Sequence, residues 1–372
     1  MSARTVNQDI LERHRSSALL WAPFLSAVPR DAHDLSVDQP AVPLDARVRE
    51  EAVKALRDGQ THYVDVPGIG SLREAIVETL GRLGIAGYTV DTAVVTAGIQ
   101  ESRFLSIQTI AGAGGTIAVP AVVHPGAQKA LGLRPLDVRT LPVDAASGMV
   151  PTSAGLREAF EEGVRLIYLE SPVRLTGAVL GATLVDEIAS LLETYDAHAI
   201  VDQGLAPWLN GDGFVALAGR PGMRERVTVI GELFPGRGLE GWGIGYLATN
   251  AEHVGDVTKL KQVMSICTST PSQFAALAAS HDDGERRASL LGQLREARSA
   301  AVEAANAAGF EVVEGAAQNV LALRHADLAA MKTALDAAGV RYADGAAFGA
   351  DDVLRVAVAA TGATTEALQN LR

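Results

Sequence analysis

The sequence predicts an α/β protein with a doubly wound, mostly parallel sheet and a smaller α+β domain at its carboxyl-terminal end. Three observations lead to this prediction. Helical and strand-like segments alternate along most of the chain, and the strand-like segments are short and apolar almost throughout. Buried parallel strands have this composition because helices cover both faces of the sheet. The 372 residues are 48% apolar and 20% charged, which is enough for a large core and two domains.

The elements of the large domain follow in order. Residues 48–59 and 71–84 carry apolar side chains at three- and four-residue spacing and end at glycine, as amphipathic helices do. Apolar, β-branched runs come next, separated by helical or turn-rich segments. They cover residues 92–98, 115–120, 164–172, 198–204 and 226–232. We therefore expect a doubly wound domain from about Thr61 to Leu260.

The carboxyl-terminal third has a different pattern. Residues 282–309 predict one long amphipathic helix, which would bridge the two domains. A helical segment at 327–339 and short apolar runs at 310–314, 319–325 and 353–360 suit a small α+β domain. The expected parts are an amino-terminal arm and helix at 1–60, a large domain at 61–260, and a linking helix with the small domain at 261–372.

Composition argues against several classes of protein. The net charge is −12 and no cluster of five or more Lys and Arg residues is present, so no nucleic-acid partner is expected. The most apolar run, residues 109–123, is too short for a membrane span and is broken by Gly and Pro. With the single Cys267 and a polar amino terminus, we expect a cytoplasmic protein without disulfides. The histidines lack metal-ligand spacing, so no metal is expected.

Seven short motifs stand in a characteristic order. One is "HYVDVPGIGSLREAI" at 62–76, in which Tyr63, Gly68 and the pair Leu72-Arg73 keep the spacing Y-x-x-x-x-G-x-x-x-L-R. The others are "DLSVDQP" at 34–40, "TAGIQES" at 96–102, "IVDQGL" at 200–205, "GLEGWGIGY" at 238–246, "TSTPSQFAALAA" at 268–279 and "LRVAVAA" at 354–360. Together they resemble the class I/II aminotransferases, which are fold-type I pyridoxal-phosphate (PLP) proteins. The resemblance implies a three-layer α/β/α large domain and a homodimer with active sites at the subunit interface.

The resemblance also implies roles for residues that this chain keeps. Asp202 matches the carboxylate that pairs with the protonated pyridine nitrogen of PLP and strengthens the ring as an electron sink. Tyr63 matches a residue that reaches the cofactor phosphate of the neighbouring subunit. Arg355 matches the arginine that grips a substrate carboxylate in two parallel hydrogen bonds. The helix start that could bind a phosphate comprises Gly98, Ile99 and Gln100.

The same resemblance implies that this chain lacks the residues that hold the cofactor in the family. Pro235 stands at the position of the Schiff-base lysine, six residues before Gly241. A proline nitrogen is locked in the main chain and cannot form an internal aldimine. Glu232 and Phe234 replace two phosphate-binding serines, and Gly243 replaces the phosphate-binding arginine. A phosphate carries about −1.5 to −2 charges, so this site would repel it, and we expect no covalent PLP.

Four further positions depart from the family pattern. Arg174 replaces the asparagine of N-P-T-G, Leu205 replaces the tyrosine after the aspartate, and His124 replaces the aromatic residue that stacks on the ring. Asp38 stands where a glycine lies near the substrate carboxylate.

Simpler interpretations stay open for the polar residues of this site. Asp202 could be a structural carboxylate, and Arg355 could form a salt bridge with Asp38 or Glu232. Arg174 and Arg237 are either solvated or rebuild a cationic pocket for another anion. His124 could be an ordinary loop residue. All five lysines are candidates to replace the missing amine, but each is expected to be a solvated surface charge, namely Lys54, Lys129, Lys259, Lys261 and Lys332. Lys129 is the best candidate among them, because the loop at His124 should border the pocket.

Three functions are compatible with this pattern. The first is a non-transaminating pseudoenzyme, or a repurposed biosynthetic catalyst, that binds a carboxylate-bearing small molecule. The second is an enzyme for an amino-acid substrate that holds PLP non-covalently through Asp202, Tyr63 and the helix start after Gly98. The third is an inactive subunit that pairs with an active paralogue and completes the partner's site with Tyr63.

Overall fold

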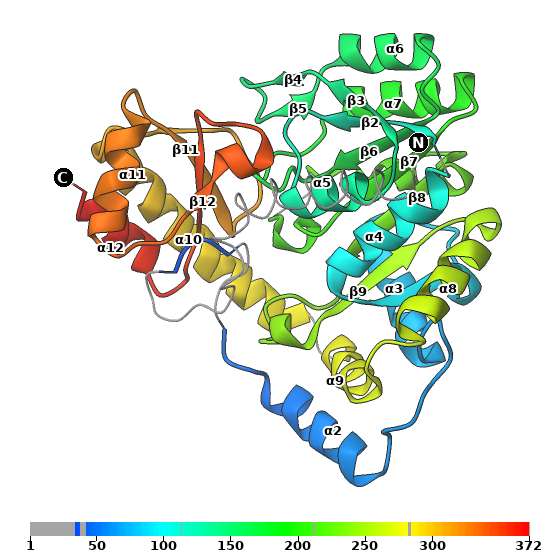
Figure 1. Ribbon diagram of the computed structural model, residues 1–372. Helices are drawn as coiled ribbons and strands as arrows, with labels where there is room; N and C mark the ends of the chain where they lie inside the picture. Colours follow the sequence, from blue (N-terminus) through cyan, green and yellow to red (C-terminus); the bar gives the residue numbers. More distant parts are fainter. Residues whose placement is uncertain (1–33, 38–41, 113, 211–212, 282–283, 372) are drawn as a thin grey trace, which may run out of the picture.

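A seven-stranded sheet with helices on both faces forms the larger part of the molecule, and a four-stranded sheet forms the smaller part (Figure 1). The computed structural model describes residues 34–37, 42–112, 114–210, 213–281 and 284–371. The predicted fold class, a mostly parallel α/β architecture with a small α+β part, is confirmed.

The large sheet has the strand order β1-β9-β8-β7-β6-β2-β3. β9 is antiparallel to both of its neighbours, and the other described pairs are parallel. The strands are β1 (Ala93–Ala97), β2 (Thr116–Pro120), β3 (Asp137–Leu141), β6 (Leu166–Glu170), β7 (His198–Asp202), β8 (Val227–Glu232) and β9 (Ile244–Ala248). A hairpin of β4 (Val143–Asp144) and β5 (Val150–Pro151) lies outside this sheet.

Two apolar cores cover the two faces of the large sheet. On one face, Val94, Ile200 and Ile230 contact helices α4 (Gly98–Ile110), α5 (Pro125–Gly132) and α8 (Ala251–Ser265). On the other, Val95 and Val201 contact α3 (Gly70–Arg82), α6 (Ser153–Glu161), α7 (Ala182–Thr194) and α9 (Thr270–Ser280). Successive strand residues therefore alternate between the two cores, which explains why the strands are apolar throughout.

The small part has a core of its own. Its sheet, in the order β10-β11-β13-β12, is antiparallel. Its strands are β10 (Glu311–Val312), β11 (Val320–Arg324), β12 (Ala343–Asp344) and β13 (Leu354–Ala357). They are covered by α10 (Gly284–Ala307), α11 (Leu328–Ala337) and α12 (Ala363–Gln369), while α2 (Ala46–Arg57) packs beside α9. Short 3₁₀ turns occupy Val90–Thr92, Ala206–Trp208, Leu217–Gly219, Met223–Glu225, Glu240–Trp242 and Gly345–Phe348.

Several elements differ from the sequence-based expectations. The edge strand β3 was not expected because its first four residues are exposed and include Asp, Arg and Thr. β9 was not expected either, since it follows a glycine-rich segment. The predicted boundary after residue 260 falls inside α8, and α9 joins the core of the large sheet. The division into domains stays a prediction. No helix in the described part of the chain has both the length and the apolarity to cross a bilayer.

Candidate functional site

Three carboxylates meet at the carboxyl-terminal edge of the large sheet. Glu170, Asp202 and Glu232 are the last residues of the neighbouring parallel strands β6, β7 and β8. Helices α4 and α5 begin beside this edge, after β1 and β2. Ligands of open α/β sheets bind in the crevice at this edge, so the fold places the predicted residues Asp202 and Glu232 where a site is expected, beside Glu170, which was not predicted.

Asp202 is held by a buried arginine that the sequence reasoning missed. Arg103 donates from Nε at 2.9 Å and from Nη2 at 2.7 Å to the same oxygen, Oδ2 of Asp202. The hydroxyl of Tyr168 donates to that oxygen at 3.2 Å, and the Gly204 amide donates to Oδ1 at 2.9 Å. Arg103 is 1% exposed and Asp202 is 0% exposed. Burial alone would raise the pKa of Asp202, but Arg103 and Arg174 hold it below its usual value.

A sequence signal for Arg103 existed. Ile99, Arg103 and Ile107 lie four residues apart on α4, and both isoleucines belong to the apolar core beneath that helix. Residues at this spacing share one helix face, so Arg103 interrupts a buried stripe. An arginine in such a stripe needs a buried partner, and Asp202 supplies it.

Glu170 and His124 form a second polar contact beside the first. The Glu170 carboxylate accepts hydrogen bonds from the backbone amides of His124, at 2.7 Å, and Arg174, at 2.9 Å. Burial, followed by the charge of Asp202, raises the pKa of Glu170 to about 7. His124 caps α5, since its Nδ1 accepts from the Gly126 amide at 2.9 Å. Burial and the nearby arginines lower the pKa of His124 well below its usual value, so its imidazole is neutral.

Three further arginines are buried, and the solvated interpretation of Arg174 and Arg237 is wrong. Each of these two is 3% exposed. Arg174 lies 3.4 Å from Glu232, and Arg237 donates to Asp45 at 2.7 Å. Arg355 donates to the carbonyl oxygens of Arg174 at 2.9 Å and Ser36 at 3.0 Å. Arg174 lies in the turn after β6, Arg237 in the loop after β8 and Arg355 within β13, and the surrounding core removes each guanidinium from water.

Pro235 lies in the loop after β8, between two cavities. One has a volume of 210 Å³ and is lined by Gly98, Ile99 and Gln100 of α4 together with Glu232, Phe234 and Gly243. The other has a volume of 470 Å³ and shares Glu232, Phe234 and Pro235 with the first. Gln100 donates to the Gly126 carbonyl at 2.9 Å, which ties the first turn of α4 to α5. The first turn of α4, where a phosphate was predicted, therefore borders a small cavity beside a carboxylate, and phosphate binding there stays a prediction.

The remaining predicted residues are scattered. Tyr63 is 77% exposed in the segment between α2 and α3, and its role across an interface stays a prediction. Leu205 is 1% exposed and belongs to the core of the small part. Asp38 lies outside the described residues.

The prediction that Lys261 is a solvated surface charge is wrong. It is 0% exposed and donates to Glu101 at 2.8 Å and to the Thr268 hydroxyl at 3.1 Å. The reason is that α8 packs against α4, which brings Lys261 over the first turn of α4. Lys54 and Lys259 are exposed and pair with neighbouring aspartates, as expected.

The other two lysines also lie away from Pro235. Lys332 is less exposed than predicted, at 21%, because it pairs with Asp344. Lys129 lies in the last turn of α5, and burial lowers its pKa. No lysine lines either cavity beside Pro235 in the described part of the chain.

These residues do not fit PLP held in the manner that the resemblance implies. The ring nitrogen would need Asp202, but Oδ2 of Asp202 already accepts from Arg103 and Tyr168. The phosphate would lie beside Glu232, and position 235 offers no amine. Only the first turn of α4 remains suited to a phosphate. Among the described residues, no group of three or more His, Cys, Asp and Glu side chains is arranged to hold a metal ion.

Comparisons with known proteins agree with the fold. The family model described as aminotransferase class I and II matches residues 30–371. A putative aminotransferase of Bacillus subtilis, YugH, is 27% identical over 306 residues, covering 81% of this chain and 78% of that protein. An aspartate aminotransferase of Thermotoga maritima is 23% identical over 344 residues, covering 92% and 90%.

A solved structure gives the same result. N-Succinyldiaminopimelate aminotransferase from Mycobacterium tuberculosis superposes with a TM-score of 0.88 at 23% identity, over 96% of this chain and 98% of that one. At this identity the likeness shows a shared fold. The match of the family model extends over nearly the whole chain, and the chain therefore belongs to the class I and II aminotransferase family, whose members depend on PLP.

Proposed function

We propose that this chain is a family member that does not transaminate and that binds a carboxylate-bearing small molecule, either as a pseudoenzyme or as a repurposed catalyst. The observation that carries the proposal is the buried contact of Arg103 with Asp202, at 2.7 and 2.9 Å. This contact gives Asp202 a permanent side-chain cation at Oδ2, one of the two oxygens through which it would meet a pyridinium nitrogen. Pro235 removes the covalent anchor independently, because it has no free amine.

The charges around the strand edge support an anionic ligand. Arg174 and Arg355 are buried close to one another, since the Arg355 guanidinium donates to the Arg174 carbonyl at 2.9 Å. Arginine forks bind carboxylates in two parallel hydrogen bonds. Glu170, with a pKa of about 7, could hold or release a proton beside such a ligand near neutral pH.

A homodimer belongs to this proposal. Tyr63, Val263, Met264 and Ile266 are 77%, 87%, 45% and 40% exposed. Exposed apolar side chains of this size mark interaction surfaces when they gather on one patch. We expect size-exclusion chromatography with light scattering to give twice the monomer mass. A monomer, or a dimer formed only with a second, active chain, would favour the inactive-subunit alternative.

The test of the proposed function is native mass spectrometry after incubation with PLP, followed by borohydride reduction and peptide mapping. The expected result is no PLP adduct on any lysine. A reduced adduct on a lysine peptide, accompanied by transamination of an amino acid, would overturn the proposal.

A second function is favoured by one specific observation. Gly98, Ile99 and Gln100 line the 210 Å³ cavity at the first turn of α4, where a phosphate could bind without a lysine. In that case PLP would be held non-covalently and would bind more tightly when an amino acid is present. Equilibrium dialysis with PLP, with and without a mixture of amino acids, separates this function from the first.

A further inference from the structure

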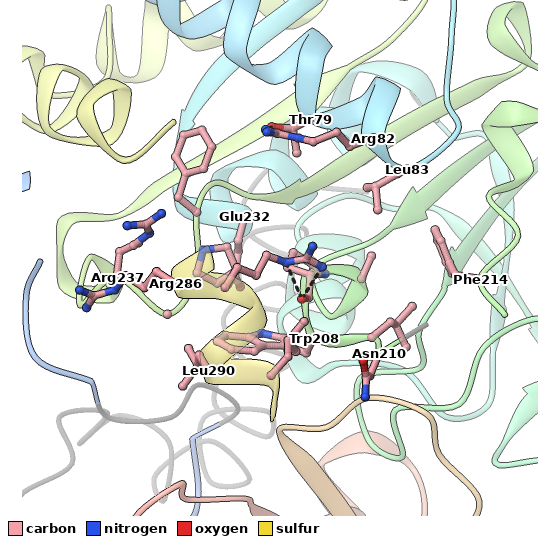
Figure 2. A pocket seen from close by; sticks show the side chains of 18 residues that line it. Thr79, Arg82, Leu83, Trp208, Asn210, Phe214, Glu232, Arg237, Arg286 and Leu290 are labelled. Carbon is pink, nitrogen blue, oxygen red and sulfur yellow. Dashed lines mark hydrogen bonds between the residues drawn. The ribbon is translucent and has the colours of Figure 1, made fainter. Parts of the chain in front are cut away.

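The larger cavity beside Pro235 touches the strand-edge cluster only through Glu232 and extends away from Asp202. It has a volume of 470 Å³, within the range of roughly 300 to 1,000 Å³ that is usual for small-molecule sites. Figure 2 shows Arg82 and Leu83 from the end of α3 on one side and Trp208 and Leu290 on the opposite side. Asp202, Arg103 and Arg355 are not among the residues that line it. The cavity therefore offers a separate binding volume.

The wall of this cavity is largely aromatic and aliphatic. Trp208 and Phe234 are 2% and 4% exposed, so their positions are fixed by packing, and Phe214 completes the aromatic wall. Gly236 keeps the cavity wide, because a Cβ there would lie 2.7 Å from Leu290 and 3.0 Å from Trp208. A flat apolar group can therefore contact rigid rings at little entropic cost.

The rim of the cavity is cationic. Arg82, Arg237, Arg286 and Arg287 line it together with Glu232. Asp45 lies 2.7 Å from Arg237 and 3.5 Å from Arg286. By contrast, Arg287 donates to the Pro207 carbonyl at 2.9 Å and Arg82 to the Thr79 hydroxyl at 3.1 Å, which are neutral acceptors (Figure 2).

The balance of charge selects the class of ligand. Within the described residues, no ion pair neutralises Arg82 or Arg287, whereas the chain as a whole has a net charge of −12. Two such cations at the mouth of a cleft attract an anion. The Glu232 carboxylate on the wall opposes a ligand with several negative charges, so a single carboxylate on an apolar ring suits the cavity best.

We propose that this cavity binds a small aromatic carboxylate, with its ring against Trp208 and its carboxylate at Arg82 and Arg287. The proposal rests on the proposed function in one respect, namely that the ligand carries a carboxylate. It assigns that ligand to the cavity behind Pro235 instead of the strand edge, because the Arg355 fork there already donates to the carbonyl oxygens of Arg174 and Ser36.

Isothermal titration calorimetry of the full chain with 3-phenylpropanoate tests this assignment, with the neutral 3-phenylpropanamide as the matched ligand. The carboxylate should bind roughly tenfold more tightly than the amide, as expected for a charge-assisted hydrogen bond. Arg287→Gln and Arg82→Gln should each weaken the carboxylate several-fold, by the same principle. Leu290→Trp should block both ligands by filling the cavity. Arg157→Gln, at a 60% exposed site on α6, is the control and should bind as the wild type does.

Two outcomes would overturn the inference. One is equal affinity for the acid and the amide, or no binding of either. The other is binding that Arg355→Lys abolishes while Arg287→Gln and Leu290→Trp leave it unchanged, which would place the ligand at the strand edge. In that second case the proposed function survives and only the location is wrong. A lysine adduct of PLP would instead refute the proposed function without bearing on this cavity.

Discussion

The two sides of Pro235 differ in what fills them. At the strand edge, buried arginines pair with carboxylates, Arg103 with Asp202 at 2.7 Å and Arg174 with Glu232 at 3.4 Å. Behind the same loop, a cavity of 470 Å³ stays open between Trp208 and an arginine rim. One scaffold thus holds a closed electrostatic cluster and an open apolar cavity a few residues apart. The difference shows that buried ion pairs can fill the space on one side of a loop while a cavity remains on its other side.

The largest expected effect of a mutation lies in the closed cluster. Arg103→Leu would leave the Asp202 carboxylate buried without its cation, and the free energy of unfolding should fall by about 3 to 5 kcal/mol. Urea denaturation followed by circular dichroism measures the change. Adding Asp202→Asn to this variant should recover part of the loss, because no buried charge then remains.

Arg157→Leu is the control for this comparison. Arg157 also pairs with a carboxylate, Glu187, but its side chain is 60% exposed. Its loss should lower the free energy of unfolding by no more than about 1 kcal/mol. Equal decreases in the free energy of unfolding for the two variants would mean that the buried Arg103–Asp202 contact stabilises the fold no more than an exposed ion pair does.

The second prediction concerns pH. The pKa of Glu170 is raised to about 7 from 4.5, so the folded state binds its proton more tightly than the unfolded state does. The stabilisation of the folded state by Glu170 is therefore fully present below about pH 4.5 and is lost as the pH rises to about 7. The loss amounts to roughly 3 kcal/mol at 1.36 kcal/mol per pKa unit.

The variant Glu170→Gln should lack this pH-dependent loss. Denaturation midpoints between pH 4.5 and 7.5 should then change less with pH in the variant than in the wild type. Glu161→Gln, at an exposed position of α6, should keep the wild-type slope. Parallel curves for all three proteins would show that Glu170 does not titrate in this range.

The third prediction concerns the open cavity. Gly236 has a φ of 79°, and its added Cβ would press on Leu290 and Trp208. Gly236→Ala should lower the free energy of unfolding by about 2 kcal/mol through backbone strain and crowding. Gly59→Ala has a similar φ of 73° with nothing within 4 Å, so it isolates the backbone contribution. A smaller loss at Gly236 than at Gly59 would contradict the crowding.

The smallest effect on stability is expected at the rim of the cavity. Arg287 is exposed and donates to a single backbone carbonyl, that of Pro207. Arg287→Gln should change the free energy of unfolding by less than about 0.5 kcal/mol. Thermal denaturation of this variant beside Arg103→Leu gives the sharpest contrast between the two sides of Pro235. A loss of several kcal/mol at Arg287 would show that the rim is structural.

Much of the fold could be predicted, because the spacing of apolar residues within a short segment indicates whether it forms a helix or a strand. The runs at 198–204 and 226–232 became β7 and β8, and the segment at 282–309 became α10, with ends that differ by a few residues. β3 and β9 were not predicted, since one is an exposed edge strand and the other follows glycines. The edge strand β1 keeps its apolar signal because its first four residues are buried, whereas β3 loses the signal because its first four residues are exposed.

Less of the candidate site could be predicted. The resemblance assigned Asp202, Glu232 and Pro235 to one cofactor site. The structure places Asp202 and Glu232 at the ends of neighbouring strands, with Pro235 in the loop that follows. The motifs did not predict which side chains pair with one another in ion pairs. Arg103 and Asp202 are 99 residues apart, and Lys261 and Glu101 are 160 apart. Two arginines that could have been solvated, Arg174 and Arg237, are buried instead.

The sequence by itself determined the family scaffold and the proline at position 235. Only the tertiary structure decided that Arg103 fills the acceptor of Asp202, that Lys261 is buried over α4, and that an open cavity lies behind Pro235. The physical reason is the separation along the chain over which each feature is determined. The spacing of apolar residues shows which face of a helix or strand is buried. An ion pair or a cavity depends instead on which distant elements meet and on how closely their side chains fill the space between them.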